Sequence, residues 1–174
     1  MTYKIRTVEA ADYSQLVEIY NYYIEHTTSS FAEAPITIKY FKHLIEEKAP
    51  KDIPFLVVEY ENQSSDSSKE IIAYAYATYW RERSAYRYSI ESSVYVDKQY
   101  HGRGIGKMLY QSLLDQIKAS EKYHLVIAGI TLPNEPSIGL HESLGFRKVA
   151  HFSEVGYKFK QWLDVGYWEL KLNK

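Results

Sequence analysis

The stretch VYVDKQYHGRGIGKML, residues 94–109, constrains the fold of this chain more than any other segment. It starts with β-branched residues typical of a strand, crosses a short polar turn and reaches three alternating glycines, Gly102, Gly104 and Gly106. Glycine permits the positive φ angles and close backbone approach that bring N–H groups together around an anion. A helix after the turn would direct its positive dipole end at the same point. The segment predicts a phosphate-binding turn, although an ordinary strand-to-helix turn also fits the glycines.

Two common phosphate loops do not fit this segment. The loop of nucleoside triphosphatases needs a glycine where the chain has His101 and a serine or threonine where it has Met108. The dinucleotide fingerprint places its third glycine one position after Gly106, and it needs an acidic residue at the end of the next strand, which is missing here. The remaining pattern is a Gly-x-Gly-x-Gly turn past the middle of the chain.

Composition and charge exclude several classes of protein. The 174 residues fit a single domain, 1–174, and a formal net charge of −1 offers no general attraction to nucleic acid or an anionic membrane. The absence of cysteine excludes disulfides, thiolate metal sites and an acyl-cysteine intermediate, and we expect no metal. The first residues lack the apolar core of a signal peptide, and no apolar run approaches the ~18 residues of a membrane span. We therefore expect a cytoplasmic protein without nucleic-acid or membrane partners.

Hydrophobic periodicity predicts strands and helices in alternation. Alternating or continuous apolar residues predict strands at 3–7, 54–60, 70–80, 86–96 and 123–130, and closing strands at 146–152 and 155–172. Helical spacing predicts helices at 13–24, 37–47 and 107–120, and a short helix from 137 that Gly145 stops. The serine-rich segment 61–69 is expected to be a surface loop.

Several segments, in order, resemble the GCN5-related N-acetyltransferase (GNAT) superfamily. The glycine turn is similar to its pyrophosphate loop, with His101 replacing the usual glutamine or arginine, and LPNEPSIGLHESLGF, residues 132–146, is similar to its later motif. Residues 19–31, 75–96 and 155–168 resemble the phosphinothricin and methionine sulfone acetyltransferases within it. The likeness spans almost the whole chain. It implies an α/β (α+β) GNAT fold, a central mixed, mostly antiparallel twisted sheet flanked by helices in a single domain.

The resemblance also implies acetyl-CoA as the cosubstrate and assigns its contacts. Backbone groups of the strand before the turn should line the acetyl group and pantetheine, the turn should hold the pyrophosphate, and an asparagine and a serine further on should contact the pantetheine. These expected contacts are Val94, Tyr95 and Val96; Gly102, Arg103, Gly104, Ile105, Gly106 and Lys107; and Asn134 and Ser143.

Acetyl transfer to an amine needs a base, because most amino-acid amines are ammonium ions at pH 7. The resemblance assigns this role to Glu91, although a solvated strand carboxylate is the alternative from spacing alone. His141 occupies the position of a general-acid tyrosine in many relatives, and we assign it an acid or substrate-orienting role; a helix-surface histidine without a role is the alternative. Without cysteine, direct attack by the amine in a ternary complex is favoured.

The resemblance implies a small acidic amino-acid analogue as acceptor, acetylated on its α-amino group. It singles out Arg83 and Tyr86 for the acceptor, with Phe31 as an aromatic wall, and a guanidinium suits a phosphinate, sulfone or carboxylate oxygen. Other cations near these segments, Arg81, Arg87, Lys158 and Lys160, would by default face solvent. Relatives are commonly homodimers, so the resemblance also implies a homodimer. Two alternatives stay open: an acetyltransferase for a polyamine, aminoglycoside or protein N-terminus, and a catalytically silent acyl-CoA sensor.

Overall fold

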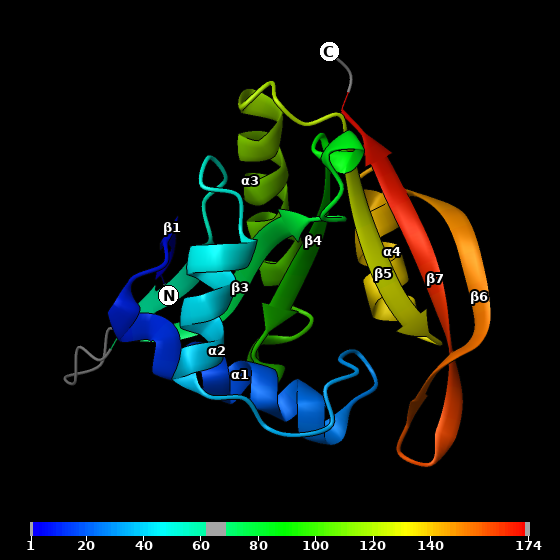
Figure 1. Ribbon diagram of the computed structural model, residues 1–174. Coiled ribbons are helices and arrows are strands. Elements are labelled where there is room, and N and C mark those ends of the chain that lie inside the picture. Colours follow the sequence, from blue (N-terminus) through cyan, green and yellow to red (C-terminus); the bar gives the residue numbers. More distant parts are fainter. Residues whose placement is uncertain (1, 62–68, 173–174) are drawn as a thin grey trace.

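A computed structural model describes residues 2–61 and 69–172, and its centre is one twisted sheet (Figure 1). Within these residues the sheet has seven strands in the order β1-β2-β3-β4-β5-β7-β6. Neighbouring strands are antiparallel except β4 and β5, which are parallel. The strands are β1 (Thr2–Thr7), β2 (Leu56–Glu61), β3 (Lys69–Tyr79), β4 (Ser89–Val96), β5 (Leu125–Leu132), β6 (Arg147–Lys158) and β7 (Gln161–Lys171).

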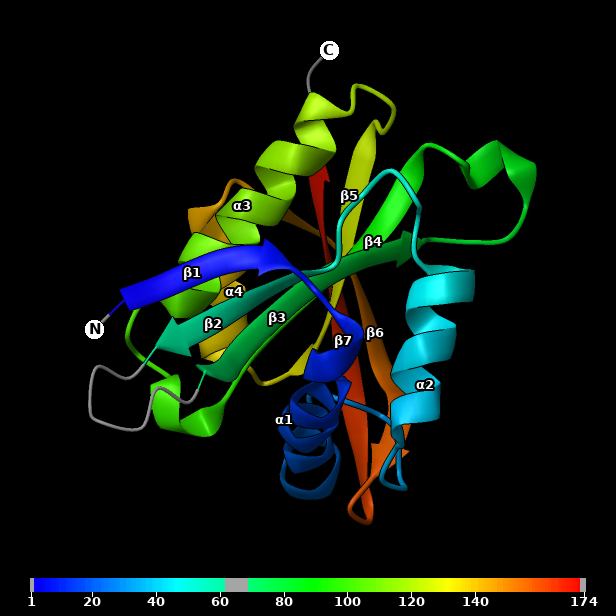
Figure 2. The same cartoon turned by 90° about the vertical axis from the view of Figure 1, so that its left-hand side faces the viewer.

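Helices cover both faces of the sheet (Figures 1 and 2). One face carries α1 (Tyr13–His26) and α2 (Ile38–His43), and α2 continues into a π-helical turn, Leu44–Lys48. The other face carries α3 (Ile105–Ala119) and α4 (Glu135–Ser143). This is the mixed, mostly antiparallel sheet with flanking helices that the sequence predicts. Among the described residues, no helix has the length and apolar character needed to cross a bilayer.

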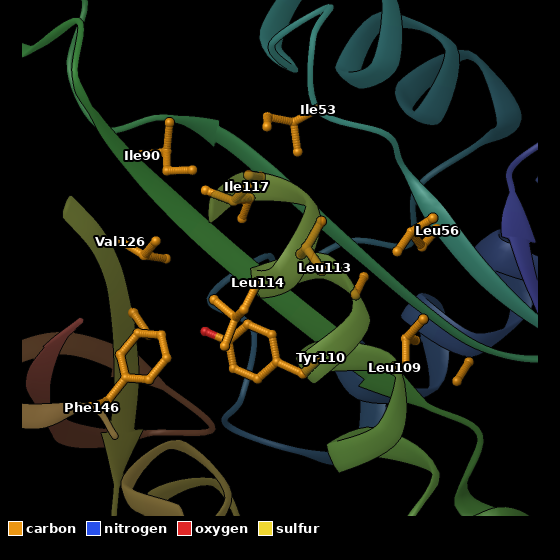
Figure 3. Close-up of a cluster of buried hydrophobic side chains, with 14 of the residues drawn as sticks. Ile53, Leu56, Ile90, Leu109, Tyr110, Leu113, Leu114, Ile117, Val126 and Phe146 are labelled. Carbon is orange, nitrogen blue, oxygen red and sulfur yellow. The ribbon is translucent and has the colours of Figure 1, made fainter. Parts of the chain in front are cut away.

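The larger hydrophobic core lies between α3 and the sheet (Figure 3). The helix buries an apolar stripe at helical spacing, and each such side chain contributes about 1.5–3 kcal/mol when fully buried. The stripe consists of Ile105, Leu109, Tyr110, Leu113, Leu114 and Ile117. A second, more aromatic core lies under α1 and α2, where Phe41 packs edge-on against Tyr74 of β3.

The observed bounds differ most from the expected ones in β4 and in the closing strands. The strand predicted at 86–96 begins at Ser89, because Ser84–Tyr86 form a 3₁₀ turn. The two closing strands predicted at 146–152 and 155–172 are instead β6 and β7, and β6 runs continuously to Lys158 through a register shift between Phe152 and Gly156. Most of the predicted serine-rich loop, residues 62–68, lies outside the described residues.

The parallel pair β4–β5 opens soon after it begins. Ladder pairing joins Ser89–Glu91 to Leu125–Ile127, while β4 continues along β3 to Val96 and β5 continues along β7 to Leu132. The two strands therefore diverge, as Figure 1 shows. The sheet is split into two halves that remain joined at one end, and the peptide groups along the gap face an open space instead of a neighbouring strand.

Candidate active site

A cavity of about 790 Å³ occupies the gap between the diverging strands. Its walls come from the ends of β4 and β5, the glycine turn, α4 and the loop after α1. The structure brings together eleven of the residues predicted for catalysis or the cofactor: Val94, Tyr95, Val96, Gly102, Gly104, Ile105, Gly106, Lys107, Asn134, His141 and Ser143. Open strand edges and a helix N-terminus supply backbone N–H groups for carbonyl and phosphate oxygens, which is the donor set that an acyl-CoA requires.

The glycine turn has the backbone conformation that its sequence requires. Gly102 and Gly104 have φ angles of 74° and 76°, and Gly104 precedes the first residue of α3. A Cβ atom at either glycine would meet nothing within 4 Å, so conformation and ligand access, not packing, select glycine there. A Cβ at Gly106 would lie 3.4 Å from Val96, which shows how closely α3 approaches β4.

Arg103 is the one predicted cofactor residue that does not line the cavity. Its guanidinium donates to the Gln99 carbonyl at 3.0 Å and lies over the Tyr100 ring at 5.0 Å. Arg103 therefore braces the turn from outside.

His101, the unusual first residue of the glycine turn, has hydrogen-bond partners that hold it in place. The Tyr23 hydroxyl donates to the Val96 carbonyl at 2.7 Å, and His101 Nε2 lies 2.9 Å from both oxygens. Burial raises the pKa of Tyr23 to about 12, so this hydroxyl keeps its proton at neutral pH. His101 thus fastens the start of the glycine turn to the end of β4 and to α1.

Asn134 and Ser143 mark the two ends of α4. The Asn134 side chain accepts from the Ser137 N–H at 3.2 Å as the helix cap, and its amide lies 3.4 Å from the Ser29 hydroxyl. The Ser143 hydroxyl donates to the Leu140 carbonyl at 2.9 Å.

His141 is buried, in contrast to the surface position that was its alternative. Its ring lies edge-on against Tyr110 and Phe146, and Nδ1 is 2.7 Å from the Ser137 carbonyl. Because a carbonyl only accepts, Nδ1 carries the proton, and burial lowers the pKa of His141 and favours the neutral ring. A neutral ring with its only N–H engaged is a poor proton donor, so this geometry fits an orienting role better than an acid role.

Glu91 lies on β4 at the point where the β4–β5 ladder ends. A Cβ atom on Gly129 of β5 would lie 3.5 Å from Glu91 Oε1, and Gly129 lines the cofactor cavity. Burial raises the pKa of Glu91, and the nearby positive charge of Arg81 lowers it in part. Burial, and secondarily the charge of Glu91, raises the pKa of Tyr167. A partly desolvated carboxylate of this kind suits a general base.

A second hollow, of about 530 Å³, is lined by Phe31 and by Ile127, the residue of β5 that pairs with Glu91. Trp80, Arg81 and Tyr167 form most of its polar and aromatic part, with Arg81 over the Trp80 ring at 4.6 Å and the Trp80 and Tyr167 rings 5.4 Å apart. Glu169 also lines the hollow, and its carboxylate is paired with Arg147 at 2.6 Å. The rest of the wall is mainly aliphatic or aromatic. Glu91 itself lines neither space, but its neighbours line both: Gly129 lines the cofactor cavity, and Arg81 and Tyr167, which interact electrostatically with Glu91, line the second hollow.

The structure does not bring the three predicted acceptor residues together. Arg83 and Tyr86 line a third hollow beside Lys48 and Lys122, while Phe31 lines the second. Trp80 and Arg81 line both of these hollows, so they stand at the border between them. Sequence reasoning singled out Arg83 and left Arg81 facing solvent. The available signal was the position of Arg81 next to Trp80 directly after a strand, but the direction of each side chain depends on the conformation of the following turn.

Comparisons with known proteins show the family. The family described as an acetyltransferase (GNAT) domain matches residues 5–166, and this chain belongs to it. The chain is 36% identical over 166 residues to a phosphinothricin N-acetyltransferase of Streptomyces viridochromogenes, covering 95% of this chain and 86% of that protein. It is 33% identical over 173 residues to an L-methionine sulfoximine/L-methionine sulfone acetyltransferase of Pseudomonas aeruginosa, covering 99% and 96%.

A solved structure gives the same result. A GNAT phosphinothricin acetyltransferase from Sinorhizobium meliloti in complex with acetyl-CoA superposes with a TM-score of 0.89 at 29% identity, covering 99% of this chain and 90% of that one. The chain is an acetyl-CoA-dependent N-acetyltransferase, as the sequence predicts.

The glycine turn gives the first prediction. Gly104→Val should weaken acetyl-CoA binding at least about tenfold, because a β-branched residue at positive φ costs of order 1–3 kcal/mol and would distort the turn. Calorimetric titration measures the dissociation constant, with the exposed helix variant Gln111→Val as control. A folded Gly104→Val protein with unchanged affinity would place the pyrophosphate elsewhere.

Proposed function

We propose that this enzyme acetylates the α-amino group of a small amino acid whose side chain carries an oxyanion or strongly polar oxygens, of the phosphinothricin, methionine sulfone or methionine sulfoximine type. The observation that carries the proposal is Arg81 in a largely apolar hollow next to Glu91. A guanidinium in such a place can hold a carboxylate, phosphinate or sulfone oxygen by paired hydrogen bonds. The names of two relatives, a phosphinothricin and a methionine sulfoximine/sulfone acetyltransferase, support the same class.

Glu91 acts as the general base in this proposal. Its carboxylate accepts a proton from the acceptor ammonium group, directly or through one water, and this frees the nitrogen lone pair. Acetyl-CoA supplies an activated acetyl group as a thioester. The amine attacks it directly in a ternary complex, since the chain contains no cysteine to carry the acetyl group. The new C–N bond replaces the C–S bond, and coenzyme A leaves as a thiolate that takes up the proton that the nitrogen loses. Val94, Tyr95 and Val96 line the cavity, and the backbone N–H groups that β4 directs toward the gap would polarise the thioester carbonyl.

We further propose that the enzyme is a homodimer whose interface is formed by β6. Each chain would contribute one catalytic domain. Strand β6 lies at the edge of the sheet and, with the turn into β7, exposes an apolar surface. This surface, the β6 patch, comprises Val149, Phe152, Val155, Tyr157, Phe159 and Trp162. Because Val149, Phe152 and Val155 also line the Arg81 hollow, a second copy on this face would help to close the acceptor site. A cytoplasmic location follows from the proposed use of acetyl-CoA and a free amino acid.

The choice between two arginines tests the acceptor site. Arg81→Gln should raise the KM of oxyanion-bearing amino acids about tenfold to a hundredfold, the range of a hydrogen bond to a charged group, with acetyl-CoA affinity unchanged. Arg83→Gln is the matched control and should change KM little. A thiol-release assay over amino acids, their sulfone, sulfoximine and phosphinate analogues, and polyamines measures this. If Arg83→Gln gives the larger defect, or polyamines are the best substrates, the proposed acceptor site is wrong.

The base assignment is tested by the pH dependence of kcat. Glu91→Gln should lower kcat by roughly 10²–10⁴ at neutral pH, and the deficit should shrink at high pH, where more acceptor arrives as the free amine. Because burial raises the pKa of Glu91, the wild-type rate should fall on the acid side at a pH above the usual range of glutamate. Arg81→Gln removes a charge that lowers this pKa, so its acid limb should move to higher pH. Near-normal kcat in Glu91→Gln would show that the proton leaves by another route.

The dimer proposal is tested at a position outside the acceptor hollow. Trp162, with 62% of its surface exposed, lies on the β6 patch but does not line the hollow. Trp162→Glu should weaken self-association by placing a charge in an apolar interface. Sedimentation equilibrium of wild type, Trp162→Glu and the α3 control Gln111→Glu measures the mass. A monomeric wild type, or an equally tight Trp162→Glu dimer, would contradict the proposal.

A further inference from the structure

The loop that follows α1 separates the cofactor cavity from the acceptor hollow. Thr27 and Ser29 line the cofactor cavity, whereas Phe31, two residues later, lines the hollow of Arg81. A shift of this short segment would change both spaces at once.

Lys158 of β6 holds this loop through three hydrogen bonds. Its ammonium group donates to the carbonyls of Ile24 at 2.6 Å, Thr27 at 3.0 Å and Ser30 at 2.6 Å. A lysine ammonium has three N–H donors and no acceptor, so its hydrogen-bonding capacity matches these three carbonyls. Two of the carbonyls belong to the C-terminal end of α1, where a cation is favourable.

The position of this lysine is unusual for its type. Only 2% of Lys158 is exposed, and lysine is almost never fully buried unless paired. Lys158 is thus a buried cation at the contact between the β6–β7 hairpin and the loop after α1, where burial of a charge is costly and adds nothing to solubility. The free-energy cost of burying this ammonium group suggests that the position of the loop matters for function.

Gly156 holds the same loop through shape. A Cβ atom at Gly156 would lie 2.3 Å from two carbons of the Phe31 ring, so the ring rests directly on the glycine backbone. Side chains alternate along a strand, and Gly156 and Lys158 are both buried while Val155 and Tyr157 are exposed. The two residues therefore belong to one inward face at the end of β6, just beyond the register shift that follows Phe152.

The loop is also tethered on the sides away from the hairpin. The Ser30 hydroxyl donates to the Tyr20 hydroxyl at 3.0 Å, and the Asn134 amide of the α4 cap lies 3.4 Å from the Ser29 hydroxyl. Figure 1 shows the loop after α1 running next to the lower part of β6 and β7. Contacts from α1, α4 and β6 thus converge on five consecutive residues, 27–31.

We propose that Gly156 and Lys158 form a clasp that positions Phe31 and so determines which acceptors fit, while the same clasp keeps Ser29 and Thr27 in place on the cofactor side. These are positioning residues and not catalytic ones, because Lys158 reaches neither space. The inference rests on the proposed acceptor hollow. Acceptor selectivity would then depend in part on the β6–β7 hairpin, which also carries the β6 patch.

Two variants separate the two parts of the clasp. Lys158→Met keeps the length of the side chain but leaves three carbonyls without their donor, and Lys160→Met removes an exposed charge from the same hairpin as the matched control. Gly156→Ala keeps Lys158 but pushes the Phe31 ring away. The measurements are acceptor KM and kcat over the amino-acid panel, acetyl-CoA affinity by calorimetry, and hydrogen exchange of residues 24–31.

If the clasp positions the loop without taking part in the reaction, its variants should change acceptor KM more than kcat. Lys158→Met should raise acceptor KM about tenfold to a hundredfold with kcat little changed, because the charge-assisted hydrogen bonds that hold the loop are lost, and should accelerate amide exchange in residues 24–31. Acetyl-CoA affinity should fall as well, because Thr27 and Ser29 of the same loop line the cofactor cavity. Gly156→Ala should change the ratio of kcat/KM between long and short acceptors, with acetyl-CoA affinity unchanged. Lys160→Met should match wild type in every measurement.

The opposite outcomes overturn the proposal. Unchanged acceptor KM and unchanged exchange in Lys158→Met would show that the lysine only fills space. If Lys158→Met does not fold, Gly156→Ala decides, and unaltered selectivity there refutes the clasp. If the wild type acetylates no amino acid in the panel, the proposed acceptor class has failed, and hydrogen exchange in Lys158→Met alone decides: faster exchange at 24–31 supports the clasp and unchanged exchange refutes it.

Discussion

The early end of the β4–β5 ladder is the constraint on which the rest of the site depends. Pairing covers Ser89–Glu91 and Leu125–Ile127, after which each strand follows its antiparallel neighbour. The gap leaves backbone donors open along β4, makes room for the cavity and places Glu91 where the two halves of the sheet still meet. If the ladder continued to Val96, the strand edge would be occupied by β5 and there would be no space for a cosubstrate.

Around this gap, polar side chains with specific partners do most of the positioning. Burial raises the pKa of Glu91 and the charge of Arg81 lowers it in part, which suits the proposed role as a base. His101 and Tyr23 fix the start of the glycine turn, and Lys158 fixes the loop that carries Phe31. The partners of each group are nearby, and Glu91 and Lys158 are in addition costly to bury, so these contacts restrict the site to one arrangement.

The sequence predicts the backbone of the site better than its side chains. The glycine turn could be found because a positive φ and close approach limit the choice of residue at Gly102 and Gly104. Arg81 could not be chosen over Arg83, since a turn of unknown conformation decides which of them lies next to Phe31. The burial of His141 and Lys158 was equally hidden, because it depends on contacts with elements distant in sequence, such as Tyr110 for the histidine and α1 for the lysine.

A crystal structure with a bisubstrate analogue, in which coenzyme A is linked covalently to the α-nitrogen of methionine sulfone, tests the central claim most directly. We expect the coenzyme arm to lie between β4 and β5 and the linked nitrogen to lie next to Glu91 or one water away. The polar oxygens of the amino-acid part should contact Arg81 beside Phe31. An amino-acid part bound instead in the hollow of Arg83 and Tyr86, or a linked nitrogen remote from Glu91, would contradict it.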